Sequence, residues 1–501
     1  MIDRDAVRDA ARYLRRVRPI DPDEISEYVE GGAHPAVVER VLREEAYDLG
    51  LREGEDGTFV PIEDGPASPP GWGPEALPER YAFALKDRLV GEFGANWHDG
   101  ESGDELREAI RRLKRDYYYE NHVEYDRIAA LGYAIYHLAD YYAAIGYVLD
   151  DLAANGLLGR RLRVLDVGAG VGGPALGLHD YLPDDALVEY VAVEPSAAAD
   201  VLSDLLAETE RNFRTTIRRE TAESYFGLED DREDGTEDGS EGKSENDGQD
   251  EGTPRKPFDL VLFGNVLSEL SDPAAVVNAA LSSTASDGSV IALAPADRNT
   301  AIGLREIERA VTTSGNSAQA TVYSPTLSLW PDATASDRGW SFDVRPDLEV
   351  PAFQRRLDEA ADRGPTDEPG EFENVDVQFA YSILRTDGTR RVDVHASSQR
   401  HMRMSETDAH VTDRVNLLAV KLSHDLADGG NPIYLIGDGS QSFDHYAVCT
   451  RETSLNRTLS EAGYGAVCAF ENALVLWNDD EEAYNLVIDD EAVVDLVAPA
   501  A

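Results

Sequence analysis

The residues best suited to chemistry are glycines that follow an acidic residue within the stretch 164–173. Leu162–Val167 reads as a buried strand, which breaks at Gly168, Ala169, Gly170 and Gly172 before Pro174 opens a helix. Glycines let the backbone turn sharply and approach a ligand that any Cβ would obstruct. Asp166, at the strand end, can accept hydrogen bonds from a cationic or hydroxylated group. The pattern predicts a tight turn that holds a small ligand, although structural turns between a strand and a helix also carry glycines.

The Asp-x-Gly-x-Gly-x-Gly pattern resembles the cofactor loop of class I S-adenosylmethionine (SAM) methyltransferases. It is less similar to the dinucleotide fingerprint, because the carboxylate precedes the glycines. The resemblance implies that Gly168, Ala169, Gly170 and Gly172 cradle the methionine portion of SAM. It also implies that Asp166 helps to hold the amino group of the cofactor.

Later segments supply the other parts of such a site. The run 188–193 reads as a second strand and ends at Glu194, where a carboxylate can bind ribose hydroxyls. A glutamate at a strand end is also ordinary in so acidic a protein. Ala222, at the end of a third strand, is expected to border the adenine. The fourth strand begins at Phe258 and ends at Gly264 and Asn265, and Asn265 is expected to line the rim that faces the methyl group. Residues 286–295 read as a turn and a fifth strand.

The charge of the chain is extreme. Its 501 residues carry a formal charge of −51, from 97 acidic and 46 basic residues, of which about five are lysine. At roughly 1 M salt the Debye length is only about 3 Å, so long-range repulsion is screened. The composition therefore indicates the cytoplasm of an extremely halophilic cell, and net charge says little here about nucleic-acid partners.

Two cysteines, Cys449 and Cys468, exclude a disulfide framework and a four-thiolate metal site within the chain. No apolar run approaches the roughly 18 residues that a membrane span needs. We expect a soluble, cytoplasmic protein with no metal site.

Residues 1–66 are predicted to form a winged-helix-like domain. Helical apolar spacing begins at Ala6, Asp21-Pro22 opens a second helix and His34-Pro35 a third, and residues 49–60 read as a hairpin. Such a unit binds nucleic acid or docks on protein. The mixed charge of the third helix argues against base reading, and both alternatives stay open.

Residues 67–160 are predicted to be a linker and a helical cap. Arg111, Arg112, Lys114 and Arg115 form a basic cluster, and nine tyrosines follow between positions 117 and 147. Basic groups among aromatic rings suit RNA, because arginines contact phosphate and rings stack on unpaired bases. The alternative is a cap whose tyrosines pack on the sheet, and the two are compatible.

The remaining boundaries follow from changes of composition. Residues 161–315 are predicted to be the Rossmann-like SAM-binding domain, with a disordered acidic insert at 229–257. Residues 316–400 read as aromatic loops and a strand extension, and residues 401–501 as a β-rich, OB-like domain. Five short apolar runs in the latter, 415–420, 433–436, 446–449, 466–470 and 473–477, suggest a small barrel. Such a barrel either binds single strands or is purely structural.

With these pieces in order, the chain from about 115 to 495 resembles the methyltransferase-like proteins associated with the mitochondrial small ribosomal subunit. The resemblance rests on the tyrosine-rich segment 133–149, on Leu165–Gly170 and on Val266–Leu270. Further matching residues are Pro295, Gly303, Arg309, Phe379, Tyr381, Ser382, Cys449 and Thr450. It implies binding of SAM and of the small ribosomal subunit or its RNA, with the basic cluster as the candidate contact.

One departure from that family concerns its iron–sulfur cluster, which cysteines hold. The corresponding loops here contain Trp330-Pro331 and Trp340–Phe342, and only Cys449 stands at a position like the last ligand. One thiolate cannot hold a four-iron cluster, so no iron–sulfur cluster is expected. The aromatic loops are expected to take over its structural role.

The overall expectation is an α/β fold. It combines a Rossmann-like class I methyltransferase core, an N-terminal winged-helix-like domain and a C-terminal small β-barrel (OB-like) domain. The expected function is a SAM-dependent methyltransferase that acts on ribosomal RNA or the small ribosomal subunit. A SAM-binding ribosome-assembly factor without catalysis and a winged-helix DNA-binding regulator are the alternatives. No catalytic base and no acceptor atom can be named from the sequence.

Overall fold

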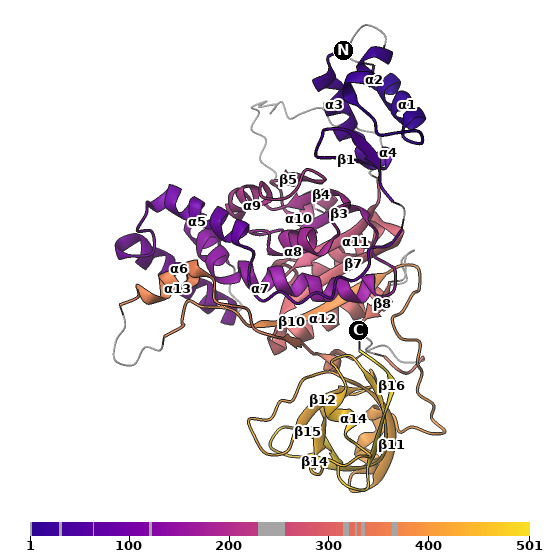
Figure 1. Cartoon of the computed structure of the whole chain (residues 1–501). Coiled ribbons are helices and arrows are strands. Elements are labelled where there is room, and N and C mark those ends of the chain that lie inside the picture. Colours follow the sequence, from indigo (N-terminus) through magenta and orange to yellow (C-terminus); the bar gives the residue numbers. More distant parts are fainter. Residues whose placement is uncertain are drawn as a thin grey trace, which may run out of the picture.

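The computed structural model describes residues 3–29, 33–63, 65–119, 123–228, 256–313, 320–325, 328–331, 336–362 and 369–500. Figure 1 shows a small N-terminal domain and a C-terminal barrel at opposite ends of a central sheet domain. The insert expected at 229–257 lies outside the described residues, except for Lys256 and Pro257. No helix within the described residues is long and apolar enough to cross a membrane.

The N-terminal domain contains helices followed by one hairpin. They are α1 (Arg4–Leu14), α2 (Pro22–Tyr28), α3 (Pro35–Glu44), α4 (Ala46–Leu49), β1 (Leu51–Glu53) and β2 (Phe59–Pro61). Asp21 caps α2 through its side chain, and Pro22 occupies the first turn, where a missing N–H costs little. The helices and hairpin lie where the sequence indicates them, whereas the winged-helix identity stays a prediction.

This domain docks on the sheet domain through the amino ends of the central strands. The amide of Glu53 donates to the Asn212 side chain at 2.8 Å, and that side chain donates back to the Glu53 carbonyl at 3.0 Å. The Tyr47 hydroxyl donates to Asp259, and the guanidinium of Arg163 lies 4.3 Å from the centre of the Tyr47 ring. The contact therefore lies at the end of the sheet opposite the glycine loop.

The central sheet has a doubly wound core. Its strands are β3 (Arg161–Val167), β4 (Leu187–Val193), β5 (Phe213–Arg218), β6 (Phe258–Gly264), β7 (Thr284–Pro295), β8 (Thr321–Ser324), β9 (Asp343–Arg345) and β10 (Val377–Arg385). The spatial order is β5-β4-β3-β6-β7-β10-β8, and β9 pairs with β10. The first five run parallel, with the order reversing at β3, whereas β10 is antiparallel to β7 and β8.

Both faces of this sheet are covered, which explains the nearly continuous apolar strands. In β6, Leu260 and Leu262 join the core on one face, while Val261 and Phe263 join the core on the other. The covering helices are α8 (Gly173–Tyr181), α9 (Ala198–Leu206), α10 (Ala222–Phe226), α11 (Pro273–Ser283) and α12 (Arg298–Thr313), and the short η1 (Leu267–Glu269) follows β6.

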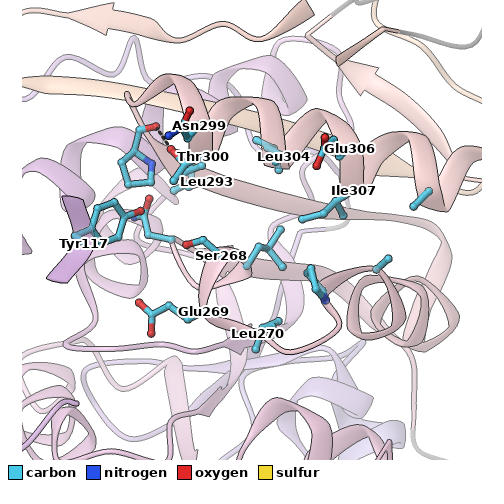
Figure 2. Close-up of a pocket in the computed structure, with 18 of the residues that line it drawn as sticks. Tyr117, Ser268, Glu269, Leu270, Leu293, Asn299, Thr300, Leu304, Glu306 and Ile307 are labelled. Atoms are coloured by element: carbon cyan, nitrogen blue, oxygen red, sulfur yellow. Dashed lines mark hydrogen bonds between the residues drawn. The ribbon is translucent and has the colours of Figure 1, made fainter. Parts of the chain in front are cut away.

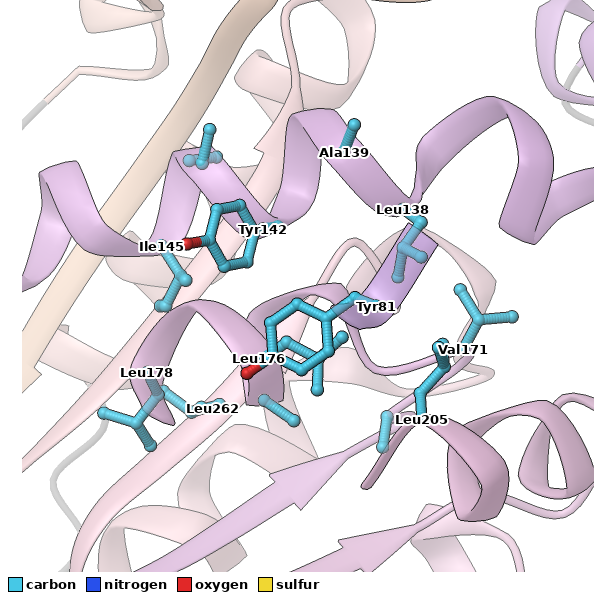
Figure 3. Packing of buried hydrophobic residues seen from close by; sticks show 14 of the residues in the cluster. Tyr81, Leu138, Ala139, Tyr142, Ile145, Val171, Leu176, Leu178, Leu205 and Leu262 are labelled. Carbon is cyan, nitrogen blue, oxygen red and sulfur yellow. The ribbon is translucent and has the colours of Figure 1, made fainter. Parts of the chain in front are cut away.

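A helical layer lies over α8. It consists of α5 (Glu79–Phe93), α6 (Gly100–Tyr118), α7 (Arg127–Ala153) and the later α13 (Ala352–Glu359). A Cβ on Gly177 of α8 would lie 2.3 Å from the carbonyl oxygen of Tyr142, so glycine lets α7 and α8 approach closely. Figure 3 shows Tyr142 and Ile145 of α7 above Leu176 and Leu178 of α8. Several tyrosines of α7 thus pack as a cap, as one of the two interpretations expects.

The C-terminal domain is a closed five-stranded barrel with one added strand. Its elements are η3 (Met404–His410), β11 (Arg414–Lys421), β12 (Ile433–Gly437), β13 (His445–Cys449), α14 (Thr458–Glu461), β14 (Val467–Asn478), β15 (Ala483–Ile488) and β16 (Val493–Ala498). The order β11-β12-β13-β15-β14 closes through β14 on β11, and β16 pairs outside on β14. The β13–β15 pair is parallel, whereas the other pairs of the barrel are antiparallel. A parallel pair needs a crossover connection, and here β14 lies between the two strands in the chain.

One strand of the barrel differs from the sequence expectation. The two runs expected at 466–470 and 473–477 are a single long strand, β14. Asn472 takes φ +62°, and the pairing register with β11 shifts nearby, so the polar pair Glu471-Asn472 forms an irregularity instead of a turn. Strands β15 and β16 were not among the expected runs.

The aromatic loops connect the barrel to the sheet domain. The Trp330 indole donates to Asp438 at 2.6 Å, and the Trp340 indole donates to Asp444 at 3.2 Å. The short η2 (Asp337–Gly339) lies between them in the chain. These two tryptophans therefore take a structural role at the barrel.

Candidate functional site

The glycine loop follows β3 and leads into α8 in a conformation that favours glycine. Gly168, Gly170 and Gly172 have φ values of +68°, +54° and +94°. A Cβ on Gly168 would lie 2.4 Å from Cγ2 of Val266, in the segment after β6. Left-handed backbone and close packing thus both require glycine at position 168.

Glu194, directly after β4, holds this loop. Its Oε2 accepts a hydrogen bond from the Gly170 amide at 2.8 Å, and its Oε1 accepts one from the Ser196 amide at 2.9 Å. The residue is only 6% exposed. Because each carboxylate oxygen has a second lone pair, Glu194 can still accept from a ligand hydroxyl.

These residues surround a cavity of about 360 Å³, called here the loop cavity. It lies at the carboxyl ends of β3, β4 and β6, where ligands bind in open α/β sheets. Six of the eight residues expected at a cofactor line it, namely Gly168, Ala169, Gly170, Gly172, Glu194 and Asn265. The other two, Asp166 and Ala222, are not among its described lining residues.

Asp166 lies within the sheet instead of at the cavity. β3 continues to Val167, and the Asp166 carboxylate accepts a hydrogen bond from the hydroxyl of Tyr190 on β4. Its Oδ1 is buried and has no hydrogen-bond partner in the described part of the chain. Burial raises the Asp166 pKa to about 7, against the Tyr190 hydrogen bond and with the help of the Glu194 charge.

Ala222 lies farther along the chain than a strand end. β5 ends at Arg218, and Ala222 is the first residue of α10, which Thr221 caps through its side chain. The residue is buried against the helices on that face of the sheet. Its expected contact with adenine therefore stays a prediction.

Asn265 lines the loop cavity and also a second cavity next to it. It follows β6, has φ +61° and is 7% exposed. Both side-chain amide atoms are buried without a hydrogen-bond partner among the described residues. The buried amide without a partner makes Asn265 a candidate for contact with a ligand.

Two further cavities adjoin the loop cavity. The outer cavity, of about 700 Å³, shares Asn265 and Glu269 with it. The tyrosine cavity, of about 660 Å³, shares Tyr125 and Tyr133 with it. Figure 2 shows Tyr117, Ser268 and Glu269 toward one end of the outer cavity and Ile307 toward the other.

Glu269 is the titratable group at this junction. Its Oε1 accepts a hydrogen bond from the Tyr125 hydroxyl at 3.0 Å. The Glu269 side chain is exposed at one side, and the cavity walls on its other side raise its pKa; the Tyr125 hydrogen bond opposes that shift and the Glu194 charge adds to it. Glu269 belongs to the segment Val266–Leu270 of the family resemblance, but no sequence pattern predicts a role for it in the site.

The tyrosines of the cavity walls are also absent from the expected site. Tyr125, Tyr133 and Tyr141 line the loop cavity. The ring centres of Tyr125 and Tyr133 are 5.5 Å apart, and those of Tyr133 and Tyr141 are 6.1 Å apart. The spacing of eight residues between the last two, which puts both on one face of α7, was the available signal.

The basic cluster of α6 has partners within the chain. Arg111 makes two hydrogen bonds of 2.7 Å to Glu371, and Arg112 contacts Asp126 at 3.1 Å. Lys114 donates to the Glu371 carbonyl at 2.6 Å and lies 4.0 Å from the Tyr136 ring centre. A contact of this cluster with RNA would compete with these bonds and stays a prediction.

The N-terminal domain shows similar internal pairing. Arg43 of α3 forms salt bridges with Glu39 and with Glu53, the latter at 2.6 Å. Arg4 and Arg8 of α1 bind Glu45 at 3.3 Å and 2.9 Å. Such pairing offers little free positive charge to a duplex.

The thiols and carboxylates of the described residues form no metal site. Cys449 and Cys468 are free and buried in the barrel. Within the ranges that the structure describes, no three His, Cys, Asp or Glu side chains are grouped so as to hold a metal ion.

Comparison with family models gives matches at the two ends of the chain. The C-terminal domain of a family described as a domain of unknown function (DUF8157) matches residues 405–497, and the N-terminal domain of that family matches residues 4–55. No curated protein matches the chain. The glycine loop and its cavities lie between the two matched segments.

The chain also matches solved structures at low sequence identity. Three of them are the precorrin-6y C5,15-methyltransferase of Geobacter metallireducens (15% identity, TM-score 0.21, 32% of this chain and 66% of that chain), the plantazolicin methyltransferase BpumL in complex with SAH (11%, 0.26, 62% and 98%) and an rRNA methylase of Streptococcus thermophilus (12%, 0.24, 48% and 96%). All three are methyltransferases. At these identities and TM-scores the similarity carries no argument about substrate or reaction.

Proposed function

We propose that this protein is a SAM-dependent methyltransferase whose cofactor binds in the loop cavity. The observation that carries the proposal is the link between Glu194 and the Gly170 amide beside Gly168, where a Cβ would meet Val266. As a result, the backbone of the glycine loop and the Glu194 carboxylate face the loop cavity. This cavity lies where the strand order reverses.

The residues present fit SAM. In the proposed pose the glycine loop lies against the methionine portion, Glu194 accepts from the ribose hydroxyls, and the unpaired amide of Asn265 faces the reacting end. When bound, SAM supplies an electrophilic methyl group on a sulfonium. The protein then has to position an acceptor in line with it and exclude water.

The proposed target is the small ribosomal subunit. Its support is the resemblance of residues 115–495 to methyltransferase-like proteins of that subunit. The pairing of Arg111, Arg112 and Lys114 inside the chain limits the surface that the basic cluster offers to RNA.

Labelled SAM tests the proposal. Purified protein in molar KCl is incubated with tritiated SAM and with small subunits from a strain that lacks the protein. Label in subunit RNA or protein, absent with Gly168→Arg, supports the enzyme. Tight SAM binding without transfer to any subunit component supports an assembly factor instead, and absence of SAM binding contradicts both.

A further inference from the structure

The part of the site beyond the glycine loop contains a carboxylate, Glu269, at the junction of two cavities. Glu269 lies where the loop cavity meets the outer cavity, and its exposed carboxylate can pair there with a positively charged group. Its hydrogen-bond donor is the neutral hydroxyl of Tyr125. No Lys or Arg is found among the described residues that line these two cavities. A cationic ligand can therefore bind beside this carboxylate.

Aromatic rings surround the same region. Tyr125 and Tyr133 meet edge to face at 90°, and Tyr141 follows Tyr133 after about two turns of α7. All three are only partly covered and line the loop cavity. The faces of tyrosine rings attract ammonium and sulfonium groups when water is excluded. Rings and carboxylate thus favour the same kind of ligand.

Asn265 provides an independent sign of a ligand. The side chain is more than nine-tenths buried, lines both cavities and has two amide atoms without a partner. Its oxygen can accept one N–H bond from an ammonium group, and Glu269 can accept another. Two acceptors on one segment, four residues apart, match the donors of a primary amine.

The outer cavity also has an apolar end. Leu270, Leu304 and Ile307 line it beyond Glu269, between η1 and α12 (Figure 2). An extended alkyl chain can lie against these side chains while its polar head stays at the junction.

We propose that the methyl acceptor is a primary alkyl amine, with its nitrogen between Glu269 and Asn265 and its chain toward Ile307. This rests on the proposed function. The amine gives up one proton to Glu269, and its lone pair then attacks the methyl carbon of SAM. The carbon–sulfur bond breaks with its electron pair going to sulfur, which leaves a neutral thioether and a methylammonium product. Glu269, at the junction of the two cavities, is the carboxylate placed to take that proton.

Binding of the amine is tested first, with a neutral ligand of the same shape. Calorimetry of the full chain in molar KCl, with S-adenosylhomocysteine present, compares n-butylamine with n-butanol. We expect binding of the amine only, weakened about tenfold by Glu269→Gln, because a charged hydrogen bond is lost. Glu208→Gln, an exposed carboxylate after α9, is the matched control and leaves the affinity unchanged. Equal affinity for amine and alcohol would overturn the proposal.

The role of the rings has its own control. Tyr133→Phe keeps the ring and should bind n-butylamine within twofold of the parent, whereas Tyr133→Leu should bind it about fivefold more weakly. Circular dichroism of each variant excludes unfolding as the cause. If Phe and Leu weaken binding equally, the ring does not act on the cation and the proposal fails.

Methyl transfer then distinguishes the sources of the amine. Tritiated SAM is offered with n-butylamine, with a lysine-containing peptide and with small-subunit RNA. Label on either amine, lost with Glu269→Gln, supports the proposal, and the better of the two identifies a free or a protein-bound source. Label only on RNA overturns the amine but preserves the methyltransferase. Failure of SAM to bind in calorimetry overturns the proposed function itself.

Discussion

The Glu194 carboxylate accepts a hydrogen bond from the Gly170 amide at 2.8 Å, which joins the end of β4 to the glycine loop after β3. Its other oxygen accepts from Ser196, at the approach to α9. One buried side chain therefore fixes two backbone segments of the same cavity wall. Loss of this residue should change the shape of the loop as well as its charge.

Glu194→Ala should lower both SAM affinity and stability. Two backbone amides lose their acceptor, which costs about 1–3 kcal/mol. We expect SAM affinity to fall at least about tenfold because the loop also loses its shape. Calorimetry and thermal unfolding in molar KCl measure the two effects. Unchanged SAM affinity with reduced stability would show that Glu194 has only a structural role.

Gly168→Ala should abolish SAM binding, and Gly227→Ala should not. Both glycines have positive φ, +68° and +67°, so both substitutions cost about 1 kcal/mol of backbone strain. Only Gly168 lacks space, because its Cβ would meet Val266 whereas that of Gly227 meets nothing within 4 Å. The added variant Val266→Ala should partly restore binding to Gly168→Ala. Equal SAM affinity in the two single variants would contradict this interpretation of the loop.

Asp166 should make the protein less stable as pH rises toward neutrality. The folded pKa is about 7 and the ordinary value is 3.8, so the folded state keeps a proton that the unfolded state has lost. The stabilisation is complete below about pH 4 and is lost as pH rises through 7. Relative to Asp166→Asn, the free energy of unfolding of the parent should fall by about 2 kcal/mol between pH 5 and 7. Urea unfolding at several pH values measures this difference. If the stabilities of the parent and of Asp166→Asn change with pH in the same way, the pKa of Asp166 is not raised.

Trp330→Phe should loosen the barrel, whereas Trp477→Phe should not. The Trp330 indole donates to Asp438, which is fully buried, while the Trp477 indole donates to Asp479 at the surface. We expect losses of about 1–3 kcal/mol for the first and under about 0.5 kcal/mol for the second. Calorimetric unfolding of the full chain measures the difference. Equal melting curves for the two variants would be inconsistent with docking through Trp330.

The sequence predicts most strands of the central sheet, because each is a run of apolar residues ended by glycine or a polar residue. It also predicts Gly168, Glu194 and Asn265 at one edge, since the carboxyl ends of parallel strands meet there. It does not reveal the partner of Asp166, because the hydroxyl of Tyr190 faces it only through the register of β3 and β4. Glu269 and Tyr125 likewise come together from segments 144 residues apart.

The same limit applies to the basic cluster. Its composition suggests RNA, but the salt bridge of Arg111 depends on Glu371, far along the chain. The aromatic loops are a contrasting example. Their tryptophans were expected to be structural, and both indoles bind aspartates of the barrel.

The most direct test of the account is calorimetric titration of the protein with SAM in molar KCl. It predicts one site per chain, which Gly168→Ala removes and Gly227→Ala preserves. If the parent protein shows no heat of binding with either SAM or S-adenosylhomocysteine, a cofactor site at the glycine loop is contradicted.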